Sequence, residues 1–163
     1  MRKGFSLMEL IVAITAVVII SGGSLIYLNN FNSRQKLEKA KNEVISSMKL
    51  AQSYAKTRQL PIGSPDKSLE YVQVQISGTN LIAGANGIGS TFFSKKIADS
   101  GEITLDLSPT QVYFWNGSGK LADENGIVLG DGETATMTIT LKADVDDSRR
   151  VTINSLGQIL NYD

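Results

Sequence analysis

An unbroken apolar stretch near the start of the chain limits what this sequence can fold into. Residues 5 to 28 are apolar or small, and Glu9 is the only charged side chain among them. A helix of that length reaches about 36 Å, more than the roughly 30 Å hydrocarbon core of a bilayer. Arg2 and Lys3 precede it, and basic residues favour the cytoplasmic side. The sequence therefore predicts a transmembrane helix over residues 5–30, with the N-terminus cytoplasmic and the rest of the chain outside.

Glu9 is the residue of this stretch that most requires an explanation. A carboxylate inside an apolar helix costs roughly 2.5–3.5 kcal/mol on membrane insertion, and such residues usually have a function and a partner. Glu9 lies about two helical turns from Lys3, so its side chain can extend to the cytoplasmic interface. That position explains how the acid is tolerated, but not why an acid is present.

The residues around Glu9 form a specific motif. Arg2 and Lys3 make a short basic leader, Gly4 and Phe5 follow it, and Glu9 lies near the head of the apolar helix. This arrangement resembles the cleavage and methylation motif of type IV prepilins, the precursors of pilins and pseudopilins. Gly4 suits a cleavage site, because the absence of a side chain lets a protease approach the backbone closely.

The resemblance implies how the chain is processed. In that family a membrane-embedded aspartyl prepilin peptidase cuts between Gly4 and Phe5, and the same enzyme methylates the new Phe5 amine. Residues 1–4 are then a leader peptide. The mature subunits leave the membrane and pack their apolar helices into the core of a helical filament. There Glu9 is expected to pair with the Phe5 ammonium of a neighbouring subunit, a contact that sets register more than it adds stability.

Two other interpretations of the apolar stretch remain open. An ordinary secretory signal peptide has an apolar region of about 7–15 residues followed by a small-residue cleavage site. This stretch is longer, and Ser21-Gly22-Gly23-Ser24 offers only a poor late cleavage site. The other alternative is a single-span anchor that is never cleaved and carries a binding domain outside the membrane.

The next segment, residues 31–60, reads as an amphipathic helical stem. It contains no Gly or Pro, and Pro61 and Gly63 end the pattern. Apolar residues recur at steps of three and four, at Leu37, Ala40, Val44, Met48, Ala51 and Ala55. The expected opposite, solvated face carries Arg34, Lys41, Asn42, Lys49 and Lys56. If the helix continues from residue 5, its expected weak point is Gly22-Gly23, since each glycine costs about 1 kcal/mol relative to Ala.

The net charge of zero conceals an uneven distribution. The whole chain has 16 basic and 16 acidic residues, but the stem is strongly basic. Its Lys and Arg residues are Arg34, Lys36, Lys39, Lys41, Lys49, Lys56 and Arg58, against Glu38 and Glu43. Residues 61–163 are correspondingly acidic. The basic face of the stem is either an ordinary solvated surface, or it is attracted to anionic lipid headgroups or to the acidic bodies of neighbouring subunits.

Residues 61–163 are predicted to form a β-rich body. Apolar and polar residues alternate over 72–76, 103–107 and 134–141, and an aromatic strand is expected at 111–115. Residues 81–83 read as a strand and 84–89 as a loop, and 150–153 with 158–160 read as a hairpin. The fold class is therefore α+β, with a long N-terminal helix packed on an antiparallel β-sheet or sandwich. The order of these elements resembles the body of type II secretion minor pseudopilin H and the related FimT-like pilins.

The composition excludes several kinds of chemistry. Without His or Cys, the chain has no imidazole base, thiol nucleophile or thiolate metal site. No catalytic residue and no cofactor are expected. Asp144, Asp146 and Asp147 are weak calcium candidates, because alternate Asp residues supply oxygen ligands but the Gly and late Glu of an EF-hand are missing. Asp123, Asn125, Asp131 and Glu133 are weighed in the same way, and a solvated turn is favoured at both places.

Nucleic acid is not an expected partner. Some FimT-like pilins take up DNA through basic residues after their last Gly. Here residues 158–163 carry no cation, and the Arg149-Arg150 pair follows three Asp residues. Non-specific DNA binding depends on the number of phosphates that are neutralised, so this chain is poorly suited to it.

The sequence thus predicts a structural subunit of a type IV pilus-like filament and not an enzyme. The favoured interpretation is a minor pseudopilin of a type II secretion system. The alternatives are a type IV or competence pilus minor pilin with an adhesive or DNA-contact role, and the uncleaved anchored domain. The expected partners are the prepilin peptidase, other pilin subunits and the membrane. The expected location is a bacterial inner membrane, with the body periplasmic or extracellular.

Overall fold

The computed structural model describes residues 6–99, 101–123, 125, 127–142 and 147–162. It divides the chain into two compact units, residues 1–36 and 37–163, and each is described by itself. The predicted processing residues Gly4 and Phe5 lie outside the described residues.

A single helix, α1 (Leu7–Thr57), contributes residues to both units. Its first turn is capped by Ser6, whose Oγ accepts a hydrogen bond from the Glu9 amide at 3.4 Å. The helix is continuous through Gly22 and Gly23, where the sequence placed its expected weak point. An α-helix tolerates an isolated glycine pair when the flanking turns keep their hydrogen bonds, because the cost is a few kcal/mol against a long cooperative segment.

The helix ends three residues before the predicted limit of the stem. Arg58 has a positive φ of 54°, which turns the backbone out of the helix. The Gln59 amide bonds to the Tyr54 carbonyl at 3.2 Å and the Arg58 amide to the Ala55 carbonyl at 3.3 Å. This pattern is a Schellman motif, which here ends the helix before Pro61 is reached.

In the first unit the described helix side chains from Leu7 to Ile20 are mostly apolar and exposed. Twelve large hydrophobic side chains between Leu7 and Phe31 are 47% to 77% exposed in the single chain. Among the residues that the structure describes, no helix is long and apolar enough to count as a membrane span. The transmembrane helix predicted over residues 5–30 is therefore not confirmed.

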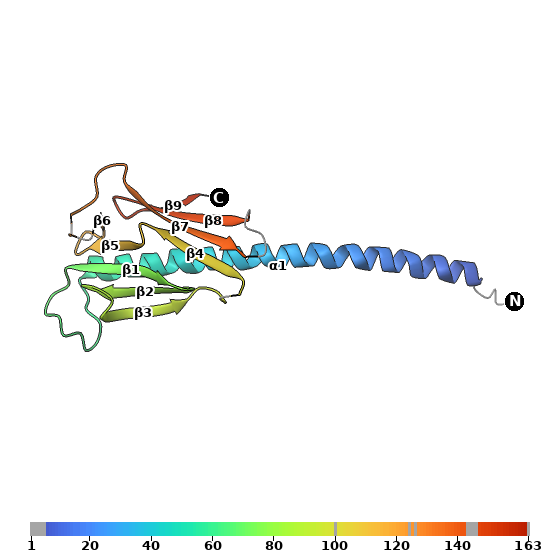
Figure 1. Ribbon diagram of the computed structural model, residues 1–163, viewed down its shortest axis with the longest axis horizontal. Helices are drawn as coiled ribbons and strands as arrows, with labels where there is room; N and C mark the ends of the chain where they lie inside the picture. The colour runs from blue at the N-terminus through green and yellow to red at the C-terminus, as the bar shows by residue number, and fades with distance from the viewer. Residues whose placement is uncertain (1–5, 100, 124, 126, 143–146, 163) are drawn as a thin grey trace. The chain divides into compact units, whose positions relative to one another are not determined.

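The second unit contains two antiparallel sheets beside the helix (Figure 1). The first has the order β3 (Ser90–Lys96), β2 (Asn80–Ala85), β1 (Tyr71–Ser77), β5 (Gln111–Trp115) and β6 (Leu121–Ala122). The second has the order β4 (Ile103–Ser108), β7 (Thr134–Leu141), β8 (Ser148–Asn154) and β9 (Ile159–Tyr162). The predicted α+β class, a helix on antiparallel sheets, is confirmed.

The core of this unit lies between the helix and the two sheets. All six residues of the predicted apolar stripe, from Leu37 to Ala55, are at most 1% exposed. They meet inward-facing strand residues such as Val72, Phe114 and Ile139, which are equally buried. Apolar residues that recur about every 3.6 residues in the helix and every 2 residues in the strands therefore identified the buried faces correctly.

Strand β3 is an element that the sequence pattern did not predict. Its pairing with β2 shifts between Ala83 and Gly84, so Phe92 is the extra residue of a β-bulge. The bulge breaks the alternation on which strand prediction depends. With the bulge, two adjacent aromatic residues of β3 lie next to the helix. Phe92 stacks on Tyr54 with ring centroids 4.4 Å apart, and Phe93 lines the same surface hollow as Leu50.

Two glycine turns are tied to the helix by one side chain. Gln52 Nε2 donates to the Gly119 carbonyl at 2.9 Å and to the Gly157 carbonyl at 2.7 Å. Gly119 follows β5 and Gly157 lies in the β8–β9 hairpin, and both have positive φ. Gln52 therefore links α1 to a turn of each sheet.

Candidate functional site

Glu9 is placed in the first turn of α1, in the unit of residues 1–36. Its side chain is exposed, and no hydrogen bond or ion pair joins it to another described residue. Ser6 and Glu9 match the capping-box pattern, in which a residue at the N-cap and an acid three positions later stabilise the helix start. The sequence carries this signal, but the prediction overlooked it because the same residues belong to the processing motif.

The helix surface around and after Glu9 has no covering partner within the described residues of its own unit. A helix that is apolar on all sides is buried in its working state, either among other helices or in lipid. An exposed acid at the start of such a surface has the chemistry to pair with a cation once that surface is covered. This combination of an uncovered apolar helix and an available carboxylate is the candidate functional site.

A second group of charged residues lies in the unit of residues 37–163, where α1 meets the sheets. Arg149 on β8 donates through Nε to Glu38 Oε1 at 2.7 Å, and its Nη1 lies 2.9 Å from Asp147 Oδ1. Lys41 Nζ is 3.5 Å from the other oxygen of Glu38. The hydrogen bond from Arg149 is the main reason why the pKa of Glu38 lies below its ordinary value.

The assignment of Lys41 to the solvated face was wrong. Lys41 is only 4% exposed. It follows Leu37 by four residues and precedes Met48 by seven, so helical spacing places it on the buried face. The cost of burying its ammonium is reduced by Glu38, one turn away.

The pairing of Glu38 leads to a pH-dependent stability. Because its pKa is lower in the folded state, the stabilisation is present above the ordinary value of 4.5 and is lost as the pH falls through the folded-state pKa. We expect Glu38→Gln to lose no more than about 1 kcal/mol at pH 7, since the side chain is 46% exposed. Urea unfolding from pH 7 to pH 3 measures the effect. Below pH 4.5 the free energy of unfolding should fall less steeply with pH in the variant than in the unchanged chain. The same fall in both chains would contradict a stabilising pair between Glu38 and Arg149.

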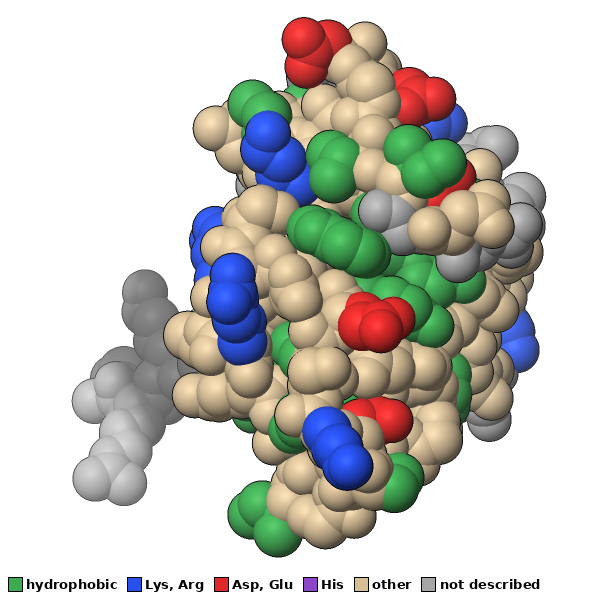
Figure 2. All heavy atoms as spheres, turned by 90° about the vertical axis from the view of Figure 1, so that its left-hand side faces the viewer, with side chains coloured by type: hydrophobic (Ala, Val, Ile, Leu, Met, Phe, Trp, Pro, Cys, Tyr) green, Lys and Arg blue, Asp and Glu red, His purple; other side chains and the backbone are tan. Residues whose placement is uncertain are grey.

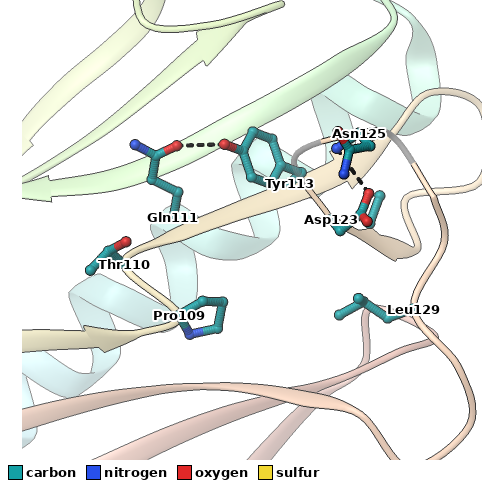
Figure 3. A pocket seen from close by; sticks show the side chains of 8 residues that line it. Pro109, Thr110, Gln111, Tyr113, Asp123, Asn125 and Leu129 are labelled. Atoms are coloured by element: carbon teal, nitrogen blue, oxygen red, sulfur yellow. Dashed lines mark hydrogen bonds between the residues drawn. The ribbon is translucent and has the colours of Figure 1, made fainter.

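A pocket of about 370 Å³ lies beside β5 and the segment after β6 (Figure 3). It is lined by Pro109, Thr110, Gln111, Tyr113, Ala122, Asp123, Asn125 and Leu129. Gln111 Oε1 accepts from the Tyr113 hydroxyl and from Gln73 Nε2. The eight lining residues include one carboxylate and no Lys or Arg. The hydrogen bonds of Gln111 and Asp123 join residues of the protein to one another and stabilise the walls of the pocket.

Three of the weak calcium candidates that the structure describes, Asp123, Glu133 and Asp147, are bonded to the chain itself, while Asp131 is exposed. Asp147 pairs with Arg149, while Asp144 and Asp146 lie outside the described residues. Asp123 Oδ1 accepts from the amides of Asn125 and Ile127 at 2.9 and 2.8 Å, and the Ile127 bond is the main cause of its lowered pKa. Within the described part of the chain, no three acidic side chains gather in a way that could hold a metal ion.

A long helix packed by its second part on two antiparallel sheets is a type IV pilin-like fold. Two crystal structures of the type IV minor pilin FimU from Pseudomonas aeruginosa share it. One, in space group P21, has a TM-score of 0.60 and 17% sequence identity, over 82% of this chain and 92% of FimU. The other, in space group P65, has a TM-score of 0.55 and 18% identity, over 78% and 93%. No protein-family model and no curated protein matches the sequence.

Proposed function

We propose that this chain is a structural subunit of a type IV pilus-like filament, with no enzymatic activity of its own. The observation that carries the proposal is the head of α1, where an uncovered apolar helix begins with a prepilin-like motif and an available Glu9 carboxylate. The pilin-like fold of the remainder supports it. In the filament, other pilin subunits would cover this helix.

The proposed route to the filament begins in a bacterial inner membrane. The precursor is held there by its N-terminal helix, with the body outside, until prepilin peptidase removes residues 1–4 and methylates Phe5. Cleavage replaces the basic leader by a single terminal ammonium. Glu9 of one subunit then pairs with the Phe5 ammonium of the next, which lowers the cost of placing both charges in an apolar core.

Mass spectrometry of the N-terminus tests the processing step. We expect the chain purified from membranes or filaments to begin at Phe5 and to carry one additional methyl group on its amine. A strain without prepilin peptidase provides the control, in which the chain should begin at Met1. An unmodified N-terminus at Met1 in the parent strain would support the uncleaved, anchored binding domain instead.

Two filament systems are candidates. The order of elements in the body resembles minor pseudopilin H, which favours a minor pseudopilin of type II secretion. The fold shared with FimU favours a minor pilin of a type IV pilus as the second candidate. Deletion of the gene separates them: a pseudopilin loss stops secretion of exported proteins and leaves surface pili, whereas a pilin loss removes pili and leaves secretion.

A further inference from the structure

The pocket beside β5 has no part in the filament function proposed above, yet its walls are held in place by contacts within the body. Tyr113 lies edge-on to Tyr71, with ring centroids 5.3 Å apart and an interplanar angle of 80°. The Tyr113 hydroxyl donates to Gln111 Oε1. In another wall, the Leu129 amide bonds to the Leu121 carbonyl at 2.9 Å. A ligand that enters a preformed hollow of this kind orders few side chains, so its binding costs little conformational entropy.

A buried glutamine orients one of the polar groups in the pocket. Gln73 on β1 is only 7% exposed, and its Nε2 donates to Gln111 Oε1 at 2.8 Å. Since burial of an amide is costly without a hydrogen bond, this contact keeps the Gln111 amide in one orientation. Gln111 Nε2 then carries two donor hydrogens, and no described residue accepts from them. Figure 3 shows this nitrogen turned away from Tyr113, so the lining contains a fixed and unused donor.

The Asp123 carboxylate supplies the acceptor. Its Oδ1 accepts from the amides of Asn125 and Ile127, which fixes the side chain and holds the pKa of Asp123 below its ordinary value. The carboxylate therefore remains ionised at neutral pH. It can accept about four hydrogen bonds in all, so capacity is left for a ligand. A hydroxyl that donates to an ionised carboxylate makes a short, charge-assisted bond.

The pocket also has an apolar side. In Figure 3, Pro109 and Leu129 lie below the row formed by Gln111, Tyr113 and Asp123. The volume of about 370 Å³ is near the lower end of the range for small-molecule sites, which is about 300–1,000 Å³. A ligand that fits must therefore be small, with one apolar face and with donors and acceptors along its edge.

The charges around the pocket exclude several other classes of ligand. Residues 109–113 and 121–133 contain no Lys or Arg. Figure 2 views the end of the body where β6 lies in Figure 1, and its Lys and Arg side chains are scattered singly. An anion would thus face the Asp123 carboxylate without a compensating cation. One carboxylate is too few for Ca²⁺, which takes about six to eight oxygen ligands. A wholly apolar ligand would leave Asp123 and Gln111 unpaired.

We infer that this pocket binds a neutral saccharide, as one hexose unit of a polysaccharide or glycan. Neighbouring ring hydroxyls donate to Asp123 and accept from Gln111 Nε2 and the Thr110 hydroxyl. The C–H face of the sugar ring packs on Pro109 and Leu129. Because each hydroxyl is both a donor and an acceptor, one ring can satisfy both kinds of polar group in the lining. This binding goes beyond the filament function and does not depend on it, since all of these residues belong to the body.

Saturation-transfer NMR on the full chain tests the inference. The chain is held in a detergent without a sugar headgroup, and the probes are D-glucose, D-galactose, D-mannose and N-acetylglucosamine. We expect at least one of these neutral sugars to bind with a Kd at or below roughly 10 mM. Inorganic phosphate and n-butylamine serve as competitors that carry a charge but no ring hydroxyls. Neither should displace the sugar.

Matched variants locate the sugar in this pocket. Gln111→Glu removes the donor hydrogens and keeps Oε1, while Asp123→Asn removes the charge of the acceptor. Each change should lower the sugar affinity at least tenfold, because a bond to a buried sugar hydroxyl is lost. Gln59→Glu and Asp131→Asn make the same chemical changes at exposed residues outside the pocket, and both controls should bind the sugar as the unchanged chain does.

Thr110→Val provides a variant whose folding is not in question. Thr110 is exposed in the β4–β5 turn, and its hydroxyl bonds to no described residue. We expect a several-fold loss of sugar affinity with unchanged urea unfolding. Absence of binding by all four sugars, displacement by phosphate or by butylamine, or unchanged affinity in all three pocket variants would each overturn the saccharide site. None of these results bears on the filament function.

Discussion

Replacing Glu9 by Gln is expected to leave cleavage between Gly4 and Phe5 close to normal and to remove the chain from filaments. In the proposed core, Glu9 is the only charge available to the Phe5 ammonium of the neighbouring subunit. Removing one partner of a buried ion pair costs about 3–5 kcal/mol, since the other charge is left uncompensated. That corresponds to roughly a hundredfold or more in an equilibrium constant. The measurement compares the mature chain in whole cells with the chain in filaments sheared from them.

The structure provides the control for this experiment. Glu9 also lies at the position of a capping-box acid, and Gln serves that position as Glu does. Glu9→Gln therefore removes the charge and keeps the helix start, whereas Ser6→Ala removes the cap and keeps the charge. We expect Glu9→Gln and Glu9→Ala to fail in assembly and Ser6→Ala to assemble. Normal amounts of Glu9→Gln in sheared filaments would show that the carboxylate has no pairing role.

The parts of the fold that the sequence predicts well are those in which one side chain pattern repeats. The apolar stripe from Leu37 to Ala55 and the alternating strands at 103–107 and 134–141 all have a single buried face. Burial of that face is the dominant favourable term in folding, so the pattern identifies the element. Strand β3 was not predicted, because the bulge at Phe92 interrupts the alternation of apolar and polar residues.

The failures in the candidate site have a different physical cause. Lys41 was assigned to solvent because its type is usually exposed, although its spacing from Leu37 and Met48 placed it on the buried face. Its partner Glu38 is paired in turn with Arg149, more than a hundred residues later in the chain. No local pattern contains that information. Ion pairs between distant segments need the tertiary structure before they can be recognised.

The same ion pairs change the meaning of the charge distribution. In the sequence the stem is basic and the body is acidic. The basic face of the stem was open to three interpretations: a solvated surface, a contact with anionic lipid headgroups, or a contact with the acidic body of a neighbouring subunit. The structure shows that the body's Arg149 and Lys95 neutralise the stem's two acids. The exposed part of the stem is therefore more uniformly basic than the sequence count indicates.

Replacing Gly157 by Ala is expected to be among the most destabilising single changes in the body. Gly157 has a φ of 75°, a left-handed conformation that costs an L-residue roughly 1–2 kcal/mol. A Cβ at this position would also overlap the Gly119 carbonyl oxygen and Gln52 Nε2. Both groups belong to the link between α1 and the two sheets, so neither can move without breaking a hydrogen bond. Such overpacking adds typically about 1–3 kcal/mol.

Gly63 is a matched control that separates these two costs. Its φ is 79°, almost the same, but nothing lies within 4 Å of a Cβ built there. Urea unfolding of the full chain should therefore show the smaller, conformational loss for Gly63→Ala and the summed loss for Gly157→Ala. Equal losses would mean that the hairpin turn shifts freely and that Gln52 does not fix it. Adding Gln52→Ala completes a double-mutant cycle, and because that change removes one of the two overlapping groups, the cost of Gly157→Ala should be smaller in its presence.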